Sequence, residues 1–253
     1  MRLTVIGCAG SYPSADSAAS CYLLQAPHDG GVFNLVMDLG NGALGTLQKH
    51  IGLHEVDAVA LSHLHADHCL DMCGMYVYRK YHPDGELRRI DVYGPRDTPG
   101  RLARAYDLAA VPGMSGQFDF HTWDSPTTTR IGPFHLTPTR VVHPVEAYAL
   151  RVECGGRTLT YSGDTGPTPA LTDAARNADV FLCEASFVES EDNPPGLHMT
   201  GADAAAVAAS AGVGRLLLTH IPAWHDRAEV EQDAKSVYDG RLELVVAGAT
   251  YQV

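Results

Sequence analysis

Short apolar runs recur along the whole chain, and most of them are bounded by Gly, Pro or Asp. The runs are rich in Val, Leu, Ile, Tyr and Thr, which favour extended backbone. Such runs between turn-forming residues predict β-strands. The predicted strands are Leu3–Ile6, Ser20–Leu24, Phe33–Met37, Ala58–Leu61, Asp91–Tyr93, Phe134–Val142, Ala149–Val152, Thr158–Tyr161, Val180–Cys183, Leu216–Thr219 and Leu242–Ala247.

Helical patterns lie between some of these runs. The clearest is Gly201–Ala211, which consists mainly of Ala and Val. Thr200 stands at its N-cap position, and Gly212 stands where a residue in left-handed conformation commonly ends a helix. Strands and helices mixed in this order predict an α/β fold with helices packed outside the sheets. The other predicted helices lie near 42–50, 68–80, 99–109, 168–177 and 226–238.

The two halves of the chain repeat one order of patterns. Each half contains two strands joined by a Gly-containing turn and followed by an Asp-x-Gly triplet, which begins at Asp38 or at Asp164. A helix, a strand, a second helix and a second strand follow each triplet. We infer a sandwich with pseudo-two-fold symmetry, in which strand ends from both halves meet at one edge. Because there is no linker rich in Pro, Gly or Ser, we expect a single domain over residues 1–253.

The net charge and the lengths of the apolar runs indicate which kinds of partner the protein can bind. The chain has 253 residues, of which 18 are basic and 30 acidic, so its net charge is −12. A protein that grips long nucleic acid usually carries a basic surface, so we expect no such partner. The N-terminus has no signal-peptide pattern, and no apolar run reaches the ~18–20 residues of a membrane helix. We therefore expect a cytoplasmic protein with no membrane partner, and we expect it to form a homodimer.

The stretch LSHLHADHCLD, residues 61–71, concentrates metal-ligand side chains. His63, His65, Asp67 and His68 fall within six positions. One regular element cannot aim all of them the same way, but a strand that turns tightly into a helix can. Neutral imidazoles and a carboxylate at this spacing suit a borderline metal such as zinc.

Three further candidate ligands each end an apolar run. They are His143 in TRVVH, Asp164 in LTYSGD and His220 in LLLTH. Together with the first group they make five histidines and two aspartates, which suits two metals better than one. Asp164, with two oxygens, is the natural bridge between ions ~3.5–4 Å apart. We therefore expect two divalent ions per chain, Zn²⁺ in the first place and Mn²⁺ as the alternative.

The motif HLHADH and the separated ligands that follow it resemble the metallo-β-lactamase superfamily over nearly the whole chain. This resemblance implies a four-layered αββα sandwich. It implies that Asp38, in LVMDLG, supports the histidine loop and does not bind metal. Asp67 is expected to act in catalysis as well as in metal binding. The resemblance further implies one metal bound by His63, His65 and His143, a second bound by Asp67, His68 and His220, and Asp164 as the bridge.

Three features resemble the ribonuclease Z branch of phosphodiesterases in this superfamily. The N-terminal VIGCAGSYP followed by SCYLL resembles the opening of those enzymes. VFLCEASF resembles a strand in which their glutamate matches Glu184, and LHMT places His198 where they carry a histidine that is not a ligand. The resemblance implies that His198 protonates the leaving oxygen or contacts the phosphate, and that Glu184 orients it.

The spacing of the second half predicts a small substrate. Ribonuclease Z carries a long tRNA-gripping arm between the segments that match His143 and Asp164, whereas here a hairpin of only twenty residues separates them. HLHADHCLD followed by YVYRKYHP resembles actinobacterial phosphodiesterases that hydrolyse cyclic nucleotides. Our first interpretation is therefore a 3′,5′-cyclic nucleotide (cAMP) phosphodiesterase. His225, five residues after His220, is a candidate for lining the substrate pocket.

Other functions stay open at the level of sequence. One is a nuclease or a hydrolase of another small phosphodiester. Another is hydrolysis of lactones or acyl esters, which would leave His198 and Glu184 without a role. A non-catalytic module with this fold has no reason to keep seven ligand side chains. Tyr12, Phe187 and Trp224 are candidates either for stacking a base near the site or for ordinary packing.

Overall fold

The apolar runs form the strands of two mixed sheets. The structure, a computed structural model, describes residues 1–189 and 192–253. One sheet has the order β15-β1-β3-β4-β5-β6-β7, with β2 beside β1. Its strands are β1 Arg2–Ala9, β2 Ala18–Ala19, β3 Cys21–His28, β4 Gly31–Met37, β5 Ala58–Ala60, β6 Ile90–Gly94, β7 Phe118–Thr122 and β15 Thr250–Gln252. The other sheet, in the order β14-β13-β12-β11-β10-β9-β8, consists of β8 Thr129–Ile131, β9 Phe134–Arg140, β10 Tyr148–Cys154, β11 Arg157–Tyr161, β12 Val180–Glu184, β13 Leu216–Thr219 and β14 Leu242–Leu244.

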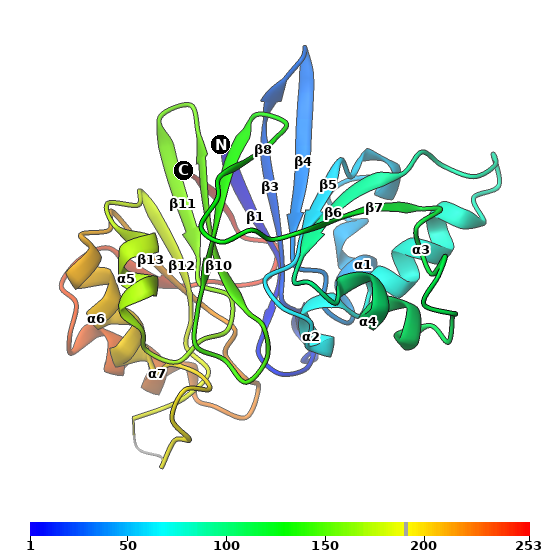
Figure 1. Ribbon diagram of the computed structural model, residues 1–253. Helices are drawn as coiled ribbons and strands as arrows, with labels where there is room; N and C mark the ends of the chain where they lie inside the picture. Colours follow the sequence, from blue (N-terminus) through cyan, green and yellow to red (C-terminus); the bar gives the residue numbers. More distant parts are fainter. Residues whose placement is uncertain (190–191) are drawn as a thin grey trace.

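Helices cover the outer faces of both sheets (Figure 1). In the first half they are α1 Ala43–Leu47, the 3₁₀ turn Leu53–Glu55, α2 Ala66–Cys69, α3 Met72–Lys80 and α4 Thr98–Ala105. In the second half they are α5 Pro169–Ala175, α6 Gly201–Ala211 and α7 Arg227–Lys235. This arrangement is the four-layered αββα sandwich, so the predicted fold class is confirmed.

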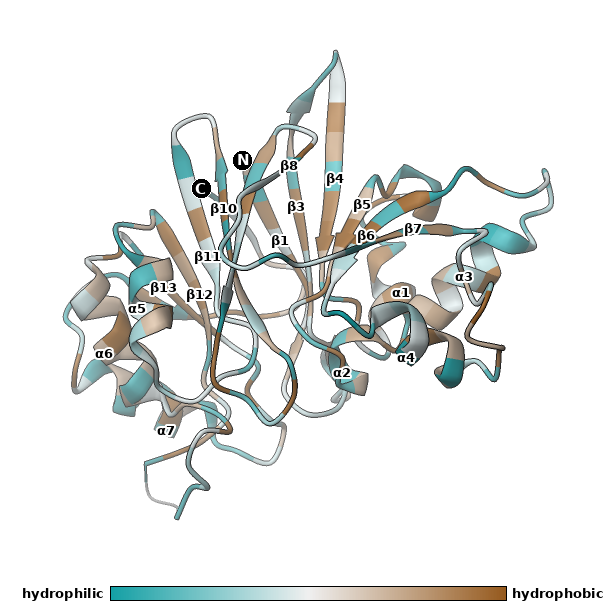
Figure 2. Cartoon of the chain, in the orientation of Figure 1, coloured by the Kyte–Doolittle hydropathy of each residue, from teal (hydrophilic) through white to brown (hydrophobic). Residues whose placement is uncertain are grey.

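The pairing of the strands repeats between the halves, as the sequence pattern predicts. From β15 to β7 the first sheet has three antiparallel pairs and then three parallel pairs. From β8 to β14 the second sheet has the same order. The central parallel strands β5, β12 and β13 are buried on both faces, which explains why their sequences read as continuous apolar runs (Figure 2).

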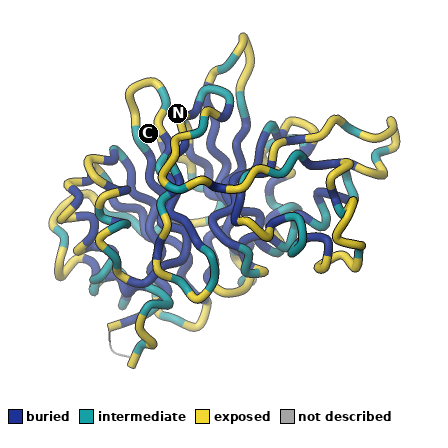
Figure 3. Tube along the Cα trace, in the orientation of Figure 1, coloured by how far each residue is buried: buried dark blue, intermediate teal, exposed yellow. Residues whose placement is uncertain are grey.

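The main core lies between the two sheets, and two further apolar layers lie beneath the helices. Buried backbone follows the strands, while exposed backbone is concentrated in the connections (Figure 3). The Tyr22 and Tyr161 rings meet across the core with centroids 4.9 Å apart. The Tyr22 hydroxyl also lies 2.7 Å from Oγ1 of Thr219. The two halves therefore share one interior, and the strand ends that carry the candidate ligands are held in register.

The predicted helix near 68–80 is wrong in one respect, because the structure contains two helices there. The amide of Leu39 donates to the carbonyl of His68, and the carbonyl of Leu39 accepts from the amide of Asp71. In a continuous helix the carbonyl of His68 and the amide of Asp71 would both pair with other residues of the helix. The loop after β4 therefore interrupts the helix just after the histidine cluster and fixes its backbone.

The remaining differences lie at edges and ends. The sequence pattern does not predict strands β2, β7, β8 and β15, and the last predicted strand ends at Leu244. By contrast, α6 has the predicted bounds Gly201–Ala211. The side chain of Thr200 accepts from the amide of Asp203 (3.1 Å), and Gly212 is left-handed. Among the described residues, no helix is long and apolar enough to cross a bilayer.

Candidate metal centre

The candidate site is built where strands from both sheets end. Asp38 follows β4, His63 lies just beyond β5, and His143 follows β9. Asp164, Glu184 and His220 follow or end β11, β12 and β13. In Figure 1 these strand ends meet along the lower edge of the sandwich, beside the short helix α2. The two halves therefore contribute to one site, as the strand pattern predicts.

Asp38 organises the loop that carries the histidines. Its backbone has a positive φ of 56° and its side chain is fully buried. One carboxylate oxygen accepts from the amide of Ser62 (2.7 Å). The other accepts from the Ser62 hydroxyl (2.7 Å), the Tyr161 hydroxyl (2.8 Å) and Nδ1 of His68 (2.8 Å). These four donors occupy the Asp38 carboxylate, which therefore supports the site without facing its centre.

Two sets of donor atoms converge next to each other. In the first, Nδ1 of His65 lies 3.1 Å from Nε2 of His63 and 3.2 Å from Nε2 of His143. In the second, Nε2 of His220 lies 3.1 Å from both Nε2 of His68 and Oδ2 of Asp67. Within each set the ligand atoms lie within 4.8 Å of one another.

Asp164 belongs to both sets through a single oxygen. Its Oδ2 lies 3.6 Å from Nε2 of His63, 3.2 Å from Nε2 of His68 and 3.6 Å from Nε2 of His220. The other oxygen, Oδ1, is buried and has no hydrogen-bond partner among the described residues. A buried carboxylate oxygen without a donor is rare in folded proteins unless an ion or water satisfies it.

The spacing of the donor atoms fits metal ions. Zinc bound tetrahedrally at about 2.0–2.1 Å holds its nitrogen and oxygen ligands roughly 3.3 Å apart. The closest contacts within each set, at 3.1–3.6 Å, bracket that value. The seven residues thus fit two adjacent divalent ions that share Asp164.

Hydrogen bonds fix which nitrogen of His63, His143 and His220 faces the centre. Nδ1 of His63 lies 3.1 Å from Oγ of Ser62, and Nδ1 of His143 donates to the carbonyl of Leu197 (2.9 Å). Nδ1 of His220 lies 2.6 Å from Oγ of Ser186. With Nδ1 occupied, Nε2 is left as the ligand atom, and such outer partners hold metal-binding imidazoles in orientation.

The sequence interpretation did not include Ser62 and Ser186. Both are buried beside the centre and contact a candidate ligand, His63 and His220 respectively. The only signal in the sequence is their position, since Ser62 directly precedes His63 and Ser186 lies in the segment CEASF. Serine is common at such positions for many reasons, so the pattern alone could not assign them.

The electrostatics suit bound cations. Burial lowers the pKa of His63, His65 and His143, which favours the neutral imidazole that binds metal. Burial alone would raise the pKa of Asp164. The neighbouring His220, His68 and His63 outweigh it and hold that pKa well below its ordinary value, so the carboxylate stays charged.

Glu184 and His198 form a pair beside the two sets. Glu184 is fully buried and its Oε1 accepts from Nδ1 of His198 (2.9 Å) and from the amide of Thr165 (2.8 Å). Burial alone would lower the pKa of His198, but the charge and hydrogen bond of Glu184 raise it to about 9. Although Glu184, His198 and His220 offer a third group of ligand atoms within 4.8 Å, the donors on Glu184 favour an orienting role for it.

The aromatic candidates lie at different places around the centre. The rings of Phe187 and His198 pack at right angles to each other, with centroids 5.2 Å apart. Tyr12 and Trp224 stack on each other. His225 accepts from the indole nitrogen of Trp224 (3.1 Å) and lines a hollow of about 340 Å³ together with Arg227. The structure therefore places His225 beside the aromatic pair and outside the two donor sets.

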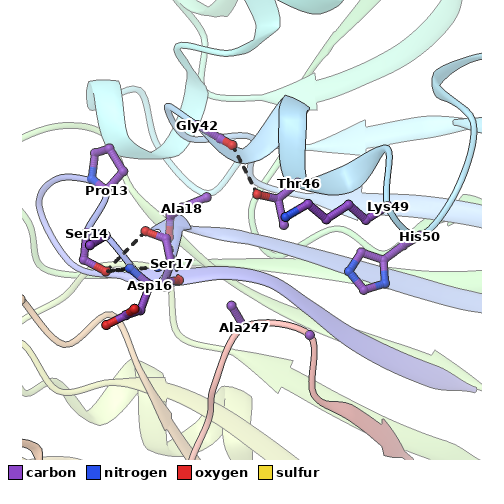
Figure 4. Close-up of a pocket in the computed structure, with 12 residues that line it drawn as sticks. Pro13, Ser14, Asp16, Ser17, Ala18, Gly42, Thr46, Lys49, His50 and Ala247 are labelled. Carbon is purple, nitrogen blue, oxygen red and sulfur yellow. Dashed lines mark hydrogen bonds between the residues drawn. The ribbon is translucent and has the colours of Figure 1, made fainter.

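A second hollow, of about 480 Å³, lies between the segment 13–18, the helix α1 and the turn at 247–248 (Figure 4). It borders the first hollow, and both include Ser14, Asp16 and Ser17. Figure 4 shows Lys49 and His50 on the α1 side and Asp16 on the opposite side. None of the seven candidate ligands lines either hollow, so neither is formed by the metal centre itself.

Known proteins resemble this chain over its full length. A family model described as beta-lactamase superfamily domain matches residues 33–221. The chain is 46% identical over its whole length to the uncharacterized protein Rv1339 of Mycobacterium tuberculosis, of which it covers 92%. It is 30% identical to the probable metallo-hydrolase YhfI of Bacillus subtilis, with all of both chains covered.

Two further matches concern the fold and the likeness to ribonuclease Z. The crystal structure of YhfI superposes with a TM-score of 0.87 at 28% identity, covering 99% of this chain and 98% of that one. A ribonuclease Z of Myxococcus xanthus is 27% identical, with 100% of this chain and 98% of the relative covered.

Proposed function

Because the chain belongs to the beta-lactamase superfamily, whose relatives include a probable metallo-hydrolase, we propose that it is a metal-dependent phosphodiester hydrolase. The proposed substrate is a 3′,5′-cyclic nucleotide, with cAMP as the first candidate. The observation that carries the proposal is the position of His198, which belongs to neither of the two donor sets. Its Nδ1 lies 2.9 Å from Oε1 of Glu184, which holds the ring in place. The ribonuclease Z among the relatives supports the phosphodiester class.

The proposed metal ligands fall into two sets that share Asp164. When bound, two divalent ions would make water a good nucleophile near neutral pH and stabilise the charge that develops on the phosphoryl group. We propose Zn²⁺ for both positions, with Mn²⁺ as the alternative, because the donors are imidazoles and carboxylates. The first set would be His63, His65, His143 and Asp164, and the second Asp67, His68, His220 and Asp164.

His198 is positioned to transfer a proton to the leaving oxygen. Its Nδ1 is held by Glu184, so the opposite ring nitrogen is free to donate to substrate. Its ring lies 5.5 Å from the His143 ring and 5.6 Å from the His220 ring, so it flanks both halves of the centre. An alkoxide leaving group needs such a donor, which typically contributes ~10²–10⁴ to the rate.

The surroundings favour a small substrate. Between His143 and Asp164 the chain forms only the hairpin of β10 and β11, whose turn is Gly155–Gly156. The net charge of −12 opposes a long polyanion. A cyclic mononucleotide carries one negative charge and needs no arm to hold it.

A panel of substrates tests the proposal. Protein loaded with Zn²⁺ or Mn²⁺ is assayed with cAMP, cGMP, 2′,3′-cyclic nucleotides, bis-p-nitrophenyl phosphate and a lactone. We expect cyclic nucleotides to be cleaved and the lactone to be left intact, with no turnover by Asp164→Ala. If the lactone is turned over far better than every phosphodiester, the proposal is wrong and acyl-ester hydrolysis takes its place.

A further inference from the structure

Two exposed aromatic side chains stack on each other near the metal centre. The rings of Tyr12 and Trp224 have centroids 5.3 Å apart and are inclined by 26°. Tyr12 is 40% exposed and Trp224 is 61% exposed, so the pair presents ring surface to solvent. A single exposed apolar side chain is ordinary on a protein surface, but these two rings together form one continuous flat surface.

Both rings belong to segments that touch His220. The amide nitrogen of Ser11 lies 3.4 Å from Nε2 of His220. Since Tyr12 is the next residue, its Cα lies within about 9 Å of that nitrogen. Trp224 follows His220 by four residues, and the amide of His225 donates to the carbonyl of Pro222 (3.1 Å), which folds this segment into a tight turn. The pair therefore stands within reach of a molecule bound at the centre.

The stacked pair of Tyr12 and Trp224, called the platform below, is held in place by contacts within the protein. Ala9 and Ile221 pair in a parallel bridge, and the amide of Gly10 donates to the carbonyl of Ile221 (3.2 Å). The two segments approach so closely that a Cβ on Gly10 would lie 2.3 Å from the carbonyl oxygen of His220. The indole nitrogen of Trp224 donates to His225 (3.1 Å), which fixes the ring. A preformed surface loses little conformational freedom on binding.

We propose that Tyr12 and Trp224 bind the nucleobase of the substrate by stacking, while the phosphodiester lies at the metal centre. This inference rests on the proposed function and deepens it, because it assigns base recognition to two named residues. Stacking accepts any base with a flat face, so it predicts tolerance between adenine and guanine. A pair of side chains is much smaller than the ~1,200 Å² or more that stable protein interfaces bury, which favours a small planar ligand over a protein partner.

Kinetics separate base stacking from structural support. Trp224→Ala should raise KM for cAMP and cGMP by about 5- to 150-fold, the usual effect of losing one aromatic–base stack, with little change in kcat. The same variant should act normally on the 3′,5′-cyclic phosphate of 1-O-methylribofuranose, which has no base. Tyr81→Ala, which removes another exposed aromatic residue at the end of α3 (64% exposed), is the matched control and should behave like wild type. Equal losses on both substrates would overturn the proposal and make the pair a support for the His220 segment.

Fluorescence tests the platform independently of hydrolysis. The chain has two tryptophans, and Trp123 is buried. AMP added to the metal-loaded protein should quench the emission of Trp224, whereas ribose 5-phosphate should not, and Trp224→Phe should abolish the effect. Quenching without hydrolysis of any nucleotide would contradict the proposed function and leave the platform standing. Hydrolysis of cAMP without quenching, or a change of oligomeric state in Trp224→Ala with unchanged KM, would reject the platform and leave the proposed function standing.

Discussion

At the residue scale, the orientation of four imidazoles depends on acceptors outside the donor sets. His63, His68 and His143 are held by Ser62, Asp38 and the Leu197 carbonyl, and His220 is held by Ser186. The seven candidate ligands, which the structure brings together, could be picked out in the sequence because four of them fall in one short stretch and three end apolar runs. Their outer partners could not, because the contacts between Ser62 and His63 and between Ser186 and His220 depend on how the loops close.

We predict that Ser186→Ala weakens binding of the second metal ion. The variant leaves Nδ1 of His220 without its partner at 2.6 Å, so the ring loses its fixed orientation. The loss of such a partner typically lowers metal affinity by ~10–100-fold. Competition with a metal-binding dye measures the affinity of each step, and Ser210→Ala on the exposed face of α6 is the control. An unchanged second step would show that Ser186 does not position His220.

We predict that His198→Ala keeps its metals and its fold but loses ~10²–10⁴ in kcat on cAMP, the usual contribution of a general acid. Glu184→Gln should give a smaller loss, because it removes only the charge that orients the imidazole. A substrate with a p-nitrophenolate leaving group needs little protonation and should suffer less from His198→Ala.

The comparison of the two substrates identifies the role of His198. Equal losses on cAMP and on the p-nitrophenyl substrate would point to phosphate binding in place of proton transfer. Unchanged kcat on both would show that His198 has no part in the reaction.

At the element scale, the sequence predicted the buried elements well and the edges poorly. The buried central strands β5, β12 and β13 and the helix α6 could be recognised because their own residues carry the signal, as apolar runs or as the Thr200 cap and Gly212. The edge strands β7, β8 and β15 are partly exposed and each pairs with one neighbour, so their sequences do not read as apolar runs. The break between α2 and α3 depends on hydrogen bonds to Leu39, which no local pattern shows.

The loop after β4 approaches α2 so closely that a side chain at Gly40 would disturb the packing. A Cβ on Gly40 would lie 1.9 Å from the carbonyl oxygen of Asp67, whereas a Cβ on Gly45 in α1 would meet nothing within 4 Å. Gly40→Ala should therefore shift the backbone of α2 and lower the free energy of unfolding by about 1–3 kcal/mol or more. Gly45→Ala should raise it by roughly 0.5–1 kcal/mol, because alanine favours helix.

Chemical denaturation of the metal-free proteins measures both effects on one scale. Metal titration of Gly40→Ala should also show a weakened second site, since Asp67 and His68 lie on α2. A Gly40→Ala protein as stable as wild type would show that the loop after β4 does not hold α2 in place.

At the scale of the whole molecule, the site exists because two similar halves meet. Each half has the same succession of antiparallel and parallel strands, and each delivers ligands from its strand ends. The repeat of Asp38 and Asp164 in the two Asp-x-Gly triplets made this arrangement predictable. Their environments then diverge. The Asp38 carboxylate accepts from four protein donors, whereas Asp164 keeps a buried oxygen that has no partner within residues 1–189 and 192–253.

The rate of cAMP hydrolysis, measured as metal-free protein is titrated with Zn²⁺, tests the central claim most directly. We predict that the rate rises until two ions are bound per chain and then stays level, and that Asp164→Ala reaches no comparable rate at any metal concentration. Full activity with one ion per chain, or two bound ions without hydrolysis of cAMP or any other phosphodiester, would contradict the account.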